Sequence, residues 1–367
     1  MQISSVSRRF VPGAASALAL ALVLGGCGAP GSDSAGGAEG SSASQASSLL
    51  PQAEGATQYP LVLTSPWGET TLDKRPERIA VVTSDFDPEY LSMLKATPVF
   101  APEDVMSNVW MNNAFPQKVE NLKKASGDEP PYEAIAASRP DVIVATAFAD
   151  KEQYDRLRKI APVVSVGGKD GTEDPDETWQ DRLTRVGEAL DLKSAAEREI
   201  QNYDQRLAAV REDHPEFEGK TISYPVYYGT EDVSFMNSTG DTSEQVFSAM
   251  GFAKNPNSEK FVQDPTVSNE QLGLLDADVM LMSDNSVSQS GESSSSLNTV
   301  TDLQLFKNLP VVKNGRVVYL SNHKDSYTVD GKTHEGNVAF AMAHSGPLAQ
   351  AWAAEQLAPY LSEALQK

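Results

Sequence analysis

Aromatic side chains gather in the segments that directly follow the buried strands expected from this sequence. Together with one histidine and one lysine, they are Trp110, Phe148, Tyr227, Tyr228, Phe235, His323, Lys324 and Tyr327. Because ligands of open α/β sheets bind beyond the carboxyl ends of the strands, these residues are placed to line a cleft. Core packing explains any one of them more simply, but as a group they favour contact with a ligand.

Two glutamates occupy matching places in a repeated pattern. Glu133 opens the helical run in YEAIAASRPDVIVAT, and Glu270 opens the one in NEQLGLLDADVMLMS. Each is followed eight residues later by an aspartate that starts a buried strand, Asp141 in the first copy and Asp278 in the second. A second, weaker echo matches LRKIAPVV with LFKNLPVV in the same order. The two matches together predict two similar α/β lobes.

The longest helical pattern is expected to join these lobes. Its apolar stripe, at spacings of four and three, comprises Ala196, Ile200, Tyr203, Leu207 and Val210. Ser194 and Glu197 have the spacing of a capping box, and Pro215 stops the helix. We place this connecting helix within residues 176–215.

Strands and helices alternate along the rest of the chain. We expect a hairpin at residues 61–72, strands at 79–82, 98–100, 141–145, 163–166, 221–227, 279–282 and 317–320, and helices at 88–95, 151–160, 241–250, 269–275 and 337–365, the last broken at Pro347. Residues 101–115 are expected to form a long loop. This order predicts mostly parallel sheets that helices cover on both faces.

The N-terminal segment has the features of a secretory signal. Two arginines precede an apolar run at residues 11–24, which is too short to span a bilayer as a permanent helix. The run ends in Leu-Gly-Gly-Cys, which resembles the lipobox of bacterial lipoproteins, whose cysteine carries a diacylglycerol. An ordinary signal followed by a stray Cys27 is the alternative. We expect residues 1–27 to be the signal with its lipobox and 28–58 to be a flexible tether, so that the lipid is the one membrane attachment.

Charge and missing motifs argue against several other classes of protein. A formal net charge of −21 disfavours binding to nucleic acid or to an anionic lipid surface. The nucleophile-elbow and Walker motifs are absent, so we predict no catalytic residues. His323, His334 and His344 offer a metal site as an alternative, but their spacings of eleven and ten fit no compact ligand motif. We therefore predict no metal site.

Six sequence blocks, in their order, resemble the iron-siderophore and vitamin B12 class of ABC-transporter substrate-binding proteins. The blocks are TLDKRPERIAVV, YEAIAASRPDVIVAT, LRKIAPVVSV, TWQDRLTRVGEALDLKSAAEREI, VSNEQLGLLDADVMLM and LPVVKNGRVVYL. The match extends from about Tyr59 to the C-terminus, and the order of the blocks is more specific than any single block. Residues 321–347 depart from the family pattern because this segment is longer and richer in histidine. The departure affects the identity of the ligand more than the fold.

The resemblance implies an α/β fold of two Rossmann-like lobes joined by one long connecting helix, the class III periplasmic-binding-protein fold. The lobes would be residues 59–175 and 216–367. It also implies a ferric siderophore bound in the cleft, without a resident cofactor, and delivered to an ABC importer. One surface glutamate on each lobe, at the positions of Glu133 and Glu270, would dock onto the permease dimer. We expect the protein to act as a monomer.

Other ligands and one other class of protein stay open at this point. Haem is a rival because Tyr327 or His323 can supply an axial ligand, and cobalamin is another. A hydrolase that uses the same cleft is the alternative from a different class. The cleft segments contain Lys151, Lys169 and Lys324 but no arginine, which favours a hydroxamate or mixed siderophore of low charge over a tris-catecholate.

Replacing Cys27 by Ser should release the mature protein from the membrane. Two ester-linked acyl chains, at about 0.8 kcal/mol per buried CH₂, hold a protein on a bilayer without an amphipathic helix. We expect the Cys27→Ser protein in the soluble or secreted fraction after cell fractionation. Sedimentation of that variant with the membranes would contradict the lipobox interpretation.

Overall fold

The computed structural model describes residues 48–83, 86–123, 129–146, 151–166, 177–230, 232–286, 296–343 and 346–367. The predicted lipid-attachment residue Cys27 lies outside these residues. So do the predicted ligand-binding residue Phe148, and also Lys169 and His344. Among the described residues, no helix is long and apolar enough to cross a membrane.

The N-terminal lobe is built on a five-stranded parallel sheet with strand order β5-β4-β3-β6-β7. Its strands are β3 (Ile79–Val81), β4 (Phe100–Pro102), β5 (Asn121–Lys123), β6 (Val142–Val144) and β7 (Val163–Val164), and its helices are α1 (Asp87–Met93), α2 (Glu103–Met106), η1 (Val109–Met111), α3 (Tyr132–Ala137) and α4 (Lys151–Leu157). All residues of β3, β4 and β6 are buried, as expected for parallel strands covered on both faces. The predicted hairpin is present as β1 (Leu61–Ser65) and β2 (Gly68–Leu72).

Residues 101–115 are not the long loop that the sequence suggested. They contain the end of β4, the helix α2 and the 3₁₀ turn η1. The apolar side chains of Val105 and Met111 are buried, which explains why this short segment folds back on the lobe.

The connection between the lobes consists of two helices rather than one. These are α5 (Trp179–Ala189) and α6 (Lys193–Asp213). They separate at Asp191, whose φ of +54° cannot continue a right-handed helix. The helices also meet closely, since a Cβ on Gly187 would lie 2.9 Å from the Cβ of Ala196.

The predicted capping box at Ser194 is wrong, because Ser194 lies inside α6. The carboxylate of Glu54 accepts hydrogen bonds from the backbone N–H groups of Ser194 (2.7 Å) and Ala195 (2.9 Å) instead. Glu54 belongs to the segment expected to be a tether. Residues 48–58 are therefore attached to the N-terminal lobe, and Leu50 is buried in its core.

The C-terminal lobe carries a mixed eight-stranded sheet. Strands β9, β12 and β13 run parallel in its centre, and β10, β14 and β15 extend it by antiparallel pairing. The strands are β8 (Ile222–Ser223), β9 (Pro225–Tyr227), β10 (Val233–Phe235), β11 (Thr266–Val267), β12 (Val279–Asp284), β13 (Val317–Asn322), β14 (Ser326–Val329) and β15 (Lys332–Glu335). The helices are η3 (Pro215–Phe217), α7 (Thr242–Ala249), η4 (Ser258–Phe261), η5 (Asn269–Leu275), α8 (Asn298–Thr301), α9 (Gln304–Lys307), α10 (Pro310–Lys313), α11 (Val338–Ala343) and α12 (Pro347–Leu365).

The two repeats seen in the sequence have different outcomes. The stronger one is structural, because α3 leads into β6 just as η5 leads into β12. The weaker one is not, since LRKIAPVV ends in strand β7 whereas LFKNLPVV ends in helix α10. The histidine-containing segment that departs from the family pattern forms the β14–β15 hairpin followed by α11.

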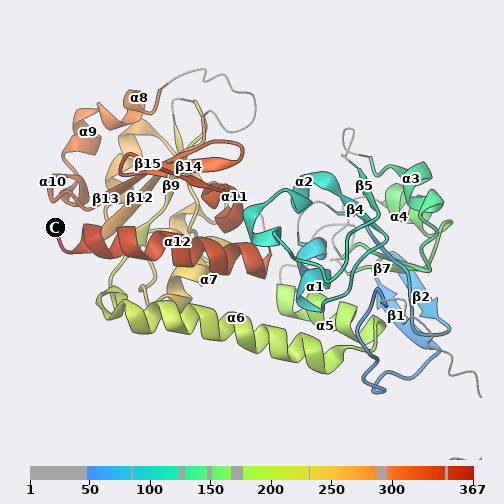
Figure 1. Ribbon diagram of the computed structural model, residues 1–367. Helices are drawn as coiled ribbons and strands as arrows, with labels where there is room; N and C mark the ends of the chain where they lie inside the picture. The colour runs from blue at the N-terminus through green and yellow to red at the C-terminus, as the bar shows by residue number, and fades with distance from the viewer. Residues whose placement is uncertain are drawn as a thin grey trace, which may run out of the picture. The chain divides into compact units, whose positions relative to one another are not determined.

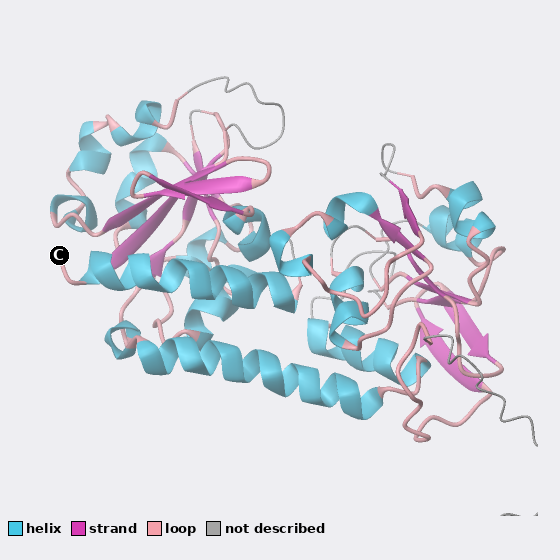
Figure 2. Cartoon of the chain, in the orientation of Figure 1, coloured by secondary structure: helices cyan, strands magenta, loops and turns pink. Residues whose placement is uncertain are grey.

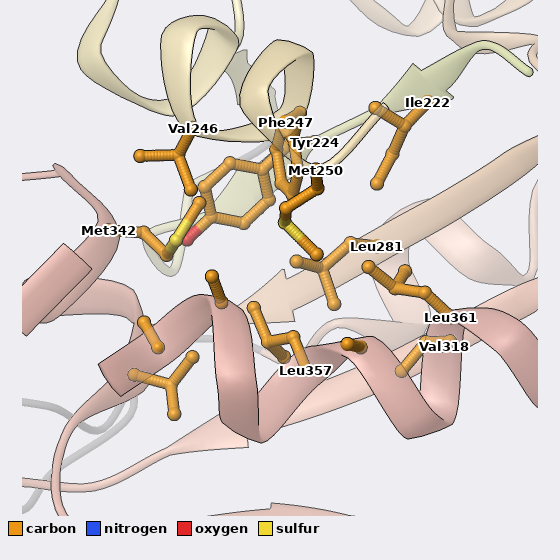
Figure 3. Close-up of a cluster of buried hydrophobic side chains, with 14 of the residues drawn as sticks. Ile222, Tyr224, Val246, Phe247, Met250, Leu281, Val318, Met342, Leu357 and Leu361 are labelled. Atoms are coloured by element: carbon orange, nitrogen blue, oxygen red, sulfur yellow. The ribbon is translucent and has the colours of Figure 1, made fainter. Parts of the chain in front are cut away.

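Each lobe has its own hydrophobic core, and α6 contributes to both. Ala196 packs in the core of the N-terminal lobe, whereas Leu207 and Val210 pack in that of the C-terminal lobe. In the latter core, side chains of α7 and α12 meet those of β12 and β13 (Figure 3). The two lobes with their α/β order confirm the predicted fold class (Figures 1 and 2).

Helices α6 and α12 lie side by side (Figure 1). Arg206 donates two hydrogen bonds to Glu355, at 2.8 and 2.9 Å, and the hydroxyl of Tyr203 donates to the side-chain oxygen of Gln350 at 3.2 Å. Since α12 follows the last strand of the C-terminal lobe, this pair ties that lobe to the connecting helix.

Replacing Asp191 by Asn should destabilise the protein by about 1–3 kcal/mol, the range for losing hydrogen bonds to a charged group, because a single amide oxygen replaces a carboxylate that accepts three of them. The Asp191 carboxylate accepts from the N–H groups of Gly55, Ala56 and Thr57 at 2.8 to 2.9 Å. Burial alone would raise its pKa, but these donors and Arg75 lower it. The stability that the ionised Asp191 carboxylate contributes is therefore fully present above the ordinary pKa of an aspartate. It is lost as the pH falls through the lowered pKa of Asp191.

Urea unfolding measures this loss, and hydrogen exchange at residues 55–57 should accelerate. Asp330→Asn is the matched control, because Asp330 also has a positive φ of 48° but is exposed. Equal stability of the two variants would contradict the attachment of residues 48–58 through Asp191.

Candidate functional site

A hollow of about 240 Å³ opens in the C-terminal lobe between the end of β10, the start of α7 and the end of α11. It is lined by Phe235, Met236, Ser238, Asp241, Thr242, Ser243, Phe261, Val262, Pro265 and Ala343. The hydroxyl of Ser243 donates to the carbonyl of Met342 at 3.2 Å, which fixes α7 to α11 at the rim.

The walls of the hollow combine aromatic and small polar groups. Phe235 and Phe261 stack with ring centroids 4.7 Å apart, and Val262 is 47% exposed. Asp241 is the one charged residue in the described part of the lining, and burial raises its pKa although hydrogen bonds from Ser238 oppose this. A wall of this composition suits an apolar or weakly polar ligand better than a highly anionic one.

The strand ends of the N-terminal lobe are closed by a buried carboxylate. Asp87 accepts hydrogen bonds from the hydroxyl of Thr83 at 2.6 Å and from the N–H of Thr146 at 2.9 Å, and it also contacts the Thr146 hydroxyl. Burial raises the pKa of Asp87, whereas these donors and Arg182 oppose the rise. The network joins the ends of the neighbouring strands β3 and β6.

Arg182 is a cation near these strand ends that the sequence reading missed. Its guanidinium lies 4.8 Å from the ring centroid of Phe86 and 3.7 Å from the carboxylate of Glu177. Its side chain is only 7% exposed. Because Arg182 is carried by helix α5 and not by a strand-end loop, the loop-based search did not include it. The spacing of Arg182 on the apolar face of α5 was the available signal.

The predicted aromatic residues divide into buried and accessible ones. Tyr227 is fully buried, with its hydroxyl 3.2 Å from that of Thr299, and Tyr327 is 1% exposed and stacks on His334 at 5.0 Å. Both side chains are enclosed by protein groups in this structure, and their contact with a ligand stays a prediction. Phe235 is also buried, but it lines the hollow.

Tyr228 is the predicted aromatic that stays well exposed, at 45%. Trp110 is partly buried and packs on Trp352 of α12 with ring centroids 5.3 Å apart. His323 is partly buried and Lys324 is exposed, between β13 and β14. None of these four residues lines the hollow, so the structure does not bring the predicted set together around it.

His334 and His214 have ordinary hydrogen-bonding partners. The hydroxyl of Tyr360 lies 3.0 Å from Nε2 of His334, and His214 lies 3.1 Å from the carboxylate of Glu216. Within the described residues, no three His, Cys, Asp or Glu side chains are grouped closely enough to hold a metal ion.

Glu133 and Glu270 occupy equivalent positions in the two lobes. Each is the second residue of a short helix, α3 or η5, that leads into a buried strand, β6 or β12. Both side chains are exposed. A carboxylate in the first turn of a helix is favourable without a partner, so position alone does not establish a docking role.

Residues 80–323, more than half of the chain, match the periplasmic binding protein family. The chain belongs to this family. Its members are solute-binding proteins and not enzymes, which removes the hydrolase alternative and confirms the predicted class. The match begins within β3 and ends after β13, so it includes both lobes.

Two curated relatives from Bacillus subtilis are similar over most of their length. The Fe(3+)-citrate-binding protein YfmC is 26% identical over 250 residues, which cover 68% of this chain and 75% of that protein. The probable siderophore-binding lipoprotein YfiY is 27% identical over 249 residues, which cover 65% of this chain and 73% of that protein.

Solved structures confirm the fold. The iron uptake ABC transporter substrate-binding protein PiaA of Streptococcus pneumoniae has a TM-score of 0.62 and 24% identity, covering 83% of this chain and 99% of that chain. SirA of Staphylococcus aureus, complexed with staphyloferrin B, has a TM-score of 0.56 and 20% identity, covering 83% and 98%.

Proposed function

We propose that this protein is a lipid-anchored extracytoplasmic receptor that binds a ferric siderophore and delivers it to an ABC-type importer. The observation that carries the proposal is the hollow beside α7 and α11, in a chain whose family binds solutes. The names of the curated relatives YfmC and YfiY support iron chelates as the ligand class. The lipobox at Cys27 supports the lipid anchor.

The composition of the hollow supports a siderophore of low charge. Among the residues that the structure describes, its lining has one carboxylate, from Asp241, and neither lysine nor arginine. A tris-catecholate complex carries several negative charges and needs a dense cationic field. A hydroxamate or mixed chelate does not, and its apolar periphery matches the stacked Phe235 and Phe261.

The haem alternative loses one of its two proposed axial ligands. Tyr327 is buried, burial raises its pKa to about 12, and its hydroxyl donates to Gln356 at 3.3 Å, so the side chain lacks the access that haem ligation requires. No observation favours cobalamin. A ferric siderophore is therefore the leading ligand.

Replacing Thr242 by Trp should fill part of the hollow and weaken ligand binding by about tenfold to a hundredfold, the range for disturbing an interface centre. Ferrichrome, ferrioxamine B and ferric staphyloferrin B serve as probes, with quenching of tryptophan emission as the readout. Ser248→Trp is the control, because Ser248 is an exposed residue of the same helix. If a probe binds both variants with equal affinity, the ligand site is not in the hollow.

Glu133 and Glu270 are the proposed docking residues for the permease dimer. Two equivalent permease subunits offer two equivalent basic pockets, and the two-lobed protein fills both with one acid from each lobe. Exposed charges of this kind govern encounter and orientation more than ligand affinity. The exposure of both side chains supports the proposal.

Changing Glu133 or Glu270 to Ala should abolish or strongly reduce siderophore-dependent uptake in cells while leaving ligand affinity within about twofold. The double variant should be worse than either single one. Glu103→Ala is the control, since Glu103 is also an exposed acid in the first turn of a helix. Normal uptake in the double variant, or loss of ligand binding in purified single variants, would rule out the docking role.

A further inference from the structure

Glu89 in α1 of the N-terminal lobe binds the start of α12 in the C-terminal lobe. Its side chain is completely buried. Oε2 accepts hydrogen bonds from the N–H groups of Leu348 at 2.8 Å and Ala349 at 3.3 Å, and Oε1 accepts one from Gly346 at 3.3 Å. Since Pro347 has no N–H, the carboxyl group serves every backbone donor from Gly346 to Ala349.

Helix α12 cannot cap itself, because its N-cap residue is Gly346. A carboxylate at this end also faces the positive end of the dipole of a 19-residue helix. The fit is tight, since a Cβ on Gly346 would lie 2.7 Å from Oε2 of Glu89 and 2.9 Å from the Cβ of Phe86. The cap is therefore supplied by the opposite lobe.

This contact lies between the hollow and the strand ends of the N-terminal lobe. On one side, Gly346 follows Ala343 of the hollow by three residues, which limits their separation to about 11 Å. On the other side, Phe86 and Asp87 precede Glu89, and Asp87 binds the strand ends at Thr83 and Thr146. A shift of Glu89 relative to α12 would therefore change the distance between the hollow and these strand ends.

We propose that Glu89 is a positioning residue, which fixes the hollow of the C-terminal lobe relative to the strand ends of the N-terminal lobe, and does so less firmly as the pH rises. The part that concerns the ligand rests on the function proposed above. The contact between the lobes does not.

The pH dependence follows from burial of the carboxyl group. Burial raises the pKa of Glu89 from 4.5 to about 7, and the N–H groups of Ala349, Leu348 and Gly346 lower it only in part. The indole N–H of Trp110 also lowers it, although it completes no well-formed hydrogen bond. Protonation at Oε1 disturbs only the single 3.3 Å bond from Gly346 and leaves both bonds to Oε2.

The direction of the pH dependence follows from the pKa of Glu89 in two states, one with α12 in contact and one with α12 moved away. If α12 moves away, the carboxyl group regains water and its ordinary pKa of 4.5. The contact therefore binds a proton more tightly than the separated state does. Its extra stability is fully present below pH 4.5 and is lost as the pH rises through about 7.

The pH dependence caused by Glu89 must be distinguished from that of the other titratable groups around α1. They are Asp87 and Tyr90 on α1 itself and Glu177 and Arg182 at the start of α5. The pKa of Tyr90 is raised well above 10, so it does not titrate near neutrality. Asp87, whose pKa burial also raises, is the competing group.

Hydrogen exchange at the N–H groups of Leu348 and Ala349 tests the contact without any ligand. Exchange at Leu357, in the same helix, serves as the reference that cancels the intrinsic pH dependence. Between pH 6 and 8, protection in the parent should fall about tenfold. Glu89→Gln, which mimics the protonated form, should keep the protection seen at pH 6 and lose the pH dependence. Asp87→Asn should retain the pH dependence.

Glu89→Asp shortens the side chain by one methylene and tests the positioning role. We expect at least tenfold faster exchange at Leu348 and Ala349 and at least tenfold weaker binding of the probe chelate, with binding restored in Glu89→Gln. Glu103→Asp is the matched control on an exposed helix start. Parental exchange in Glu89→Asp, or a parental pH profile in Glu89→Gln, would overturn the proposal. Normal exchange behaviour with no chelate bound by the parent would instead reject only the proposed ligand.

Discussion

The fold depends on one rigid helix that belongs to two hydrophobic cores. Ala196 is buried in the core of the N-terminal lobe and Val210 in that of the C-terminal lobe. At about 1.5 Å per residue, the 14 steps between them hold the two cores about 21 Å apart along the axis of α6. The close packing of Gly187 on Ala196 fixes where this helix leaves the first lobe. The spacing of the two sheets is therefore set by the length of α6, because each end of this helix is buried in the core of one lobe.

Buried parallel strands were predictable from sequence because they combine continuous apolar residues with a following helix. Strands β3, β6 and β12 were found in this way. The hairpin β14–β15 was missed because it is rich in polar residues, as in Lys-Thr-His-Glu of β15. The signal for it was present in Asp330-Gly331, a pair that favours a tight hairpin turn and has φ values of 48° and 73°. A charged strand at a sheet edge has no apolar pattern to find.

The arrangement of the predicted site side chains was harder to predict than the fold because position along a strand does not determine which way a side chain points. Tyr227 is the last residue of β9 and Tyr228 follows it directly, yet the first packs in the core and the second is exposed. Alternation along an extended chain produces this difference, and only the pairing of the strands decides which residue faces inward. The cap at α6 was misassigned for a related reason. Glu54 and Ser194 are brought together by tertiary packing that local spacing does not record.

The glycine that begins α12 has a consequence for how the two lobes can be exchanged between proteins. A helix that carries its own N-cap side chain folds with its lobe wherever that lobe is transplanted. The last helix of this protein instead relies on a group from the first third of the chain, 257 residues before Gly346. A chimera that joins this C-terminal lobe to a foreign N-terminal lobe would leave the first turn of α12 with buried, unpaired donors unless the new lobe carries an acid at the matching place. The two lobes are therefore a matched pair at this one residue, even though each has a core of its own.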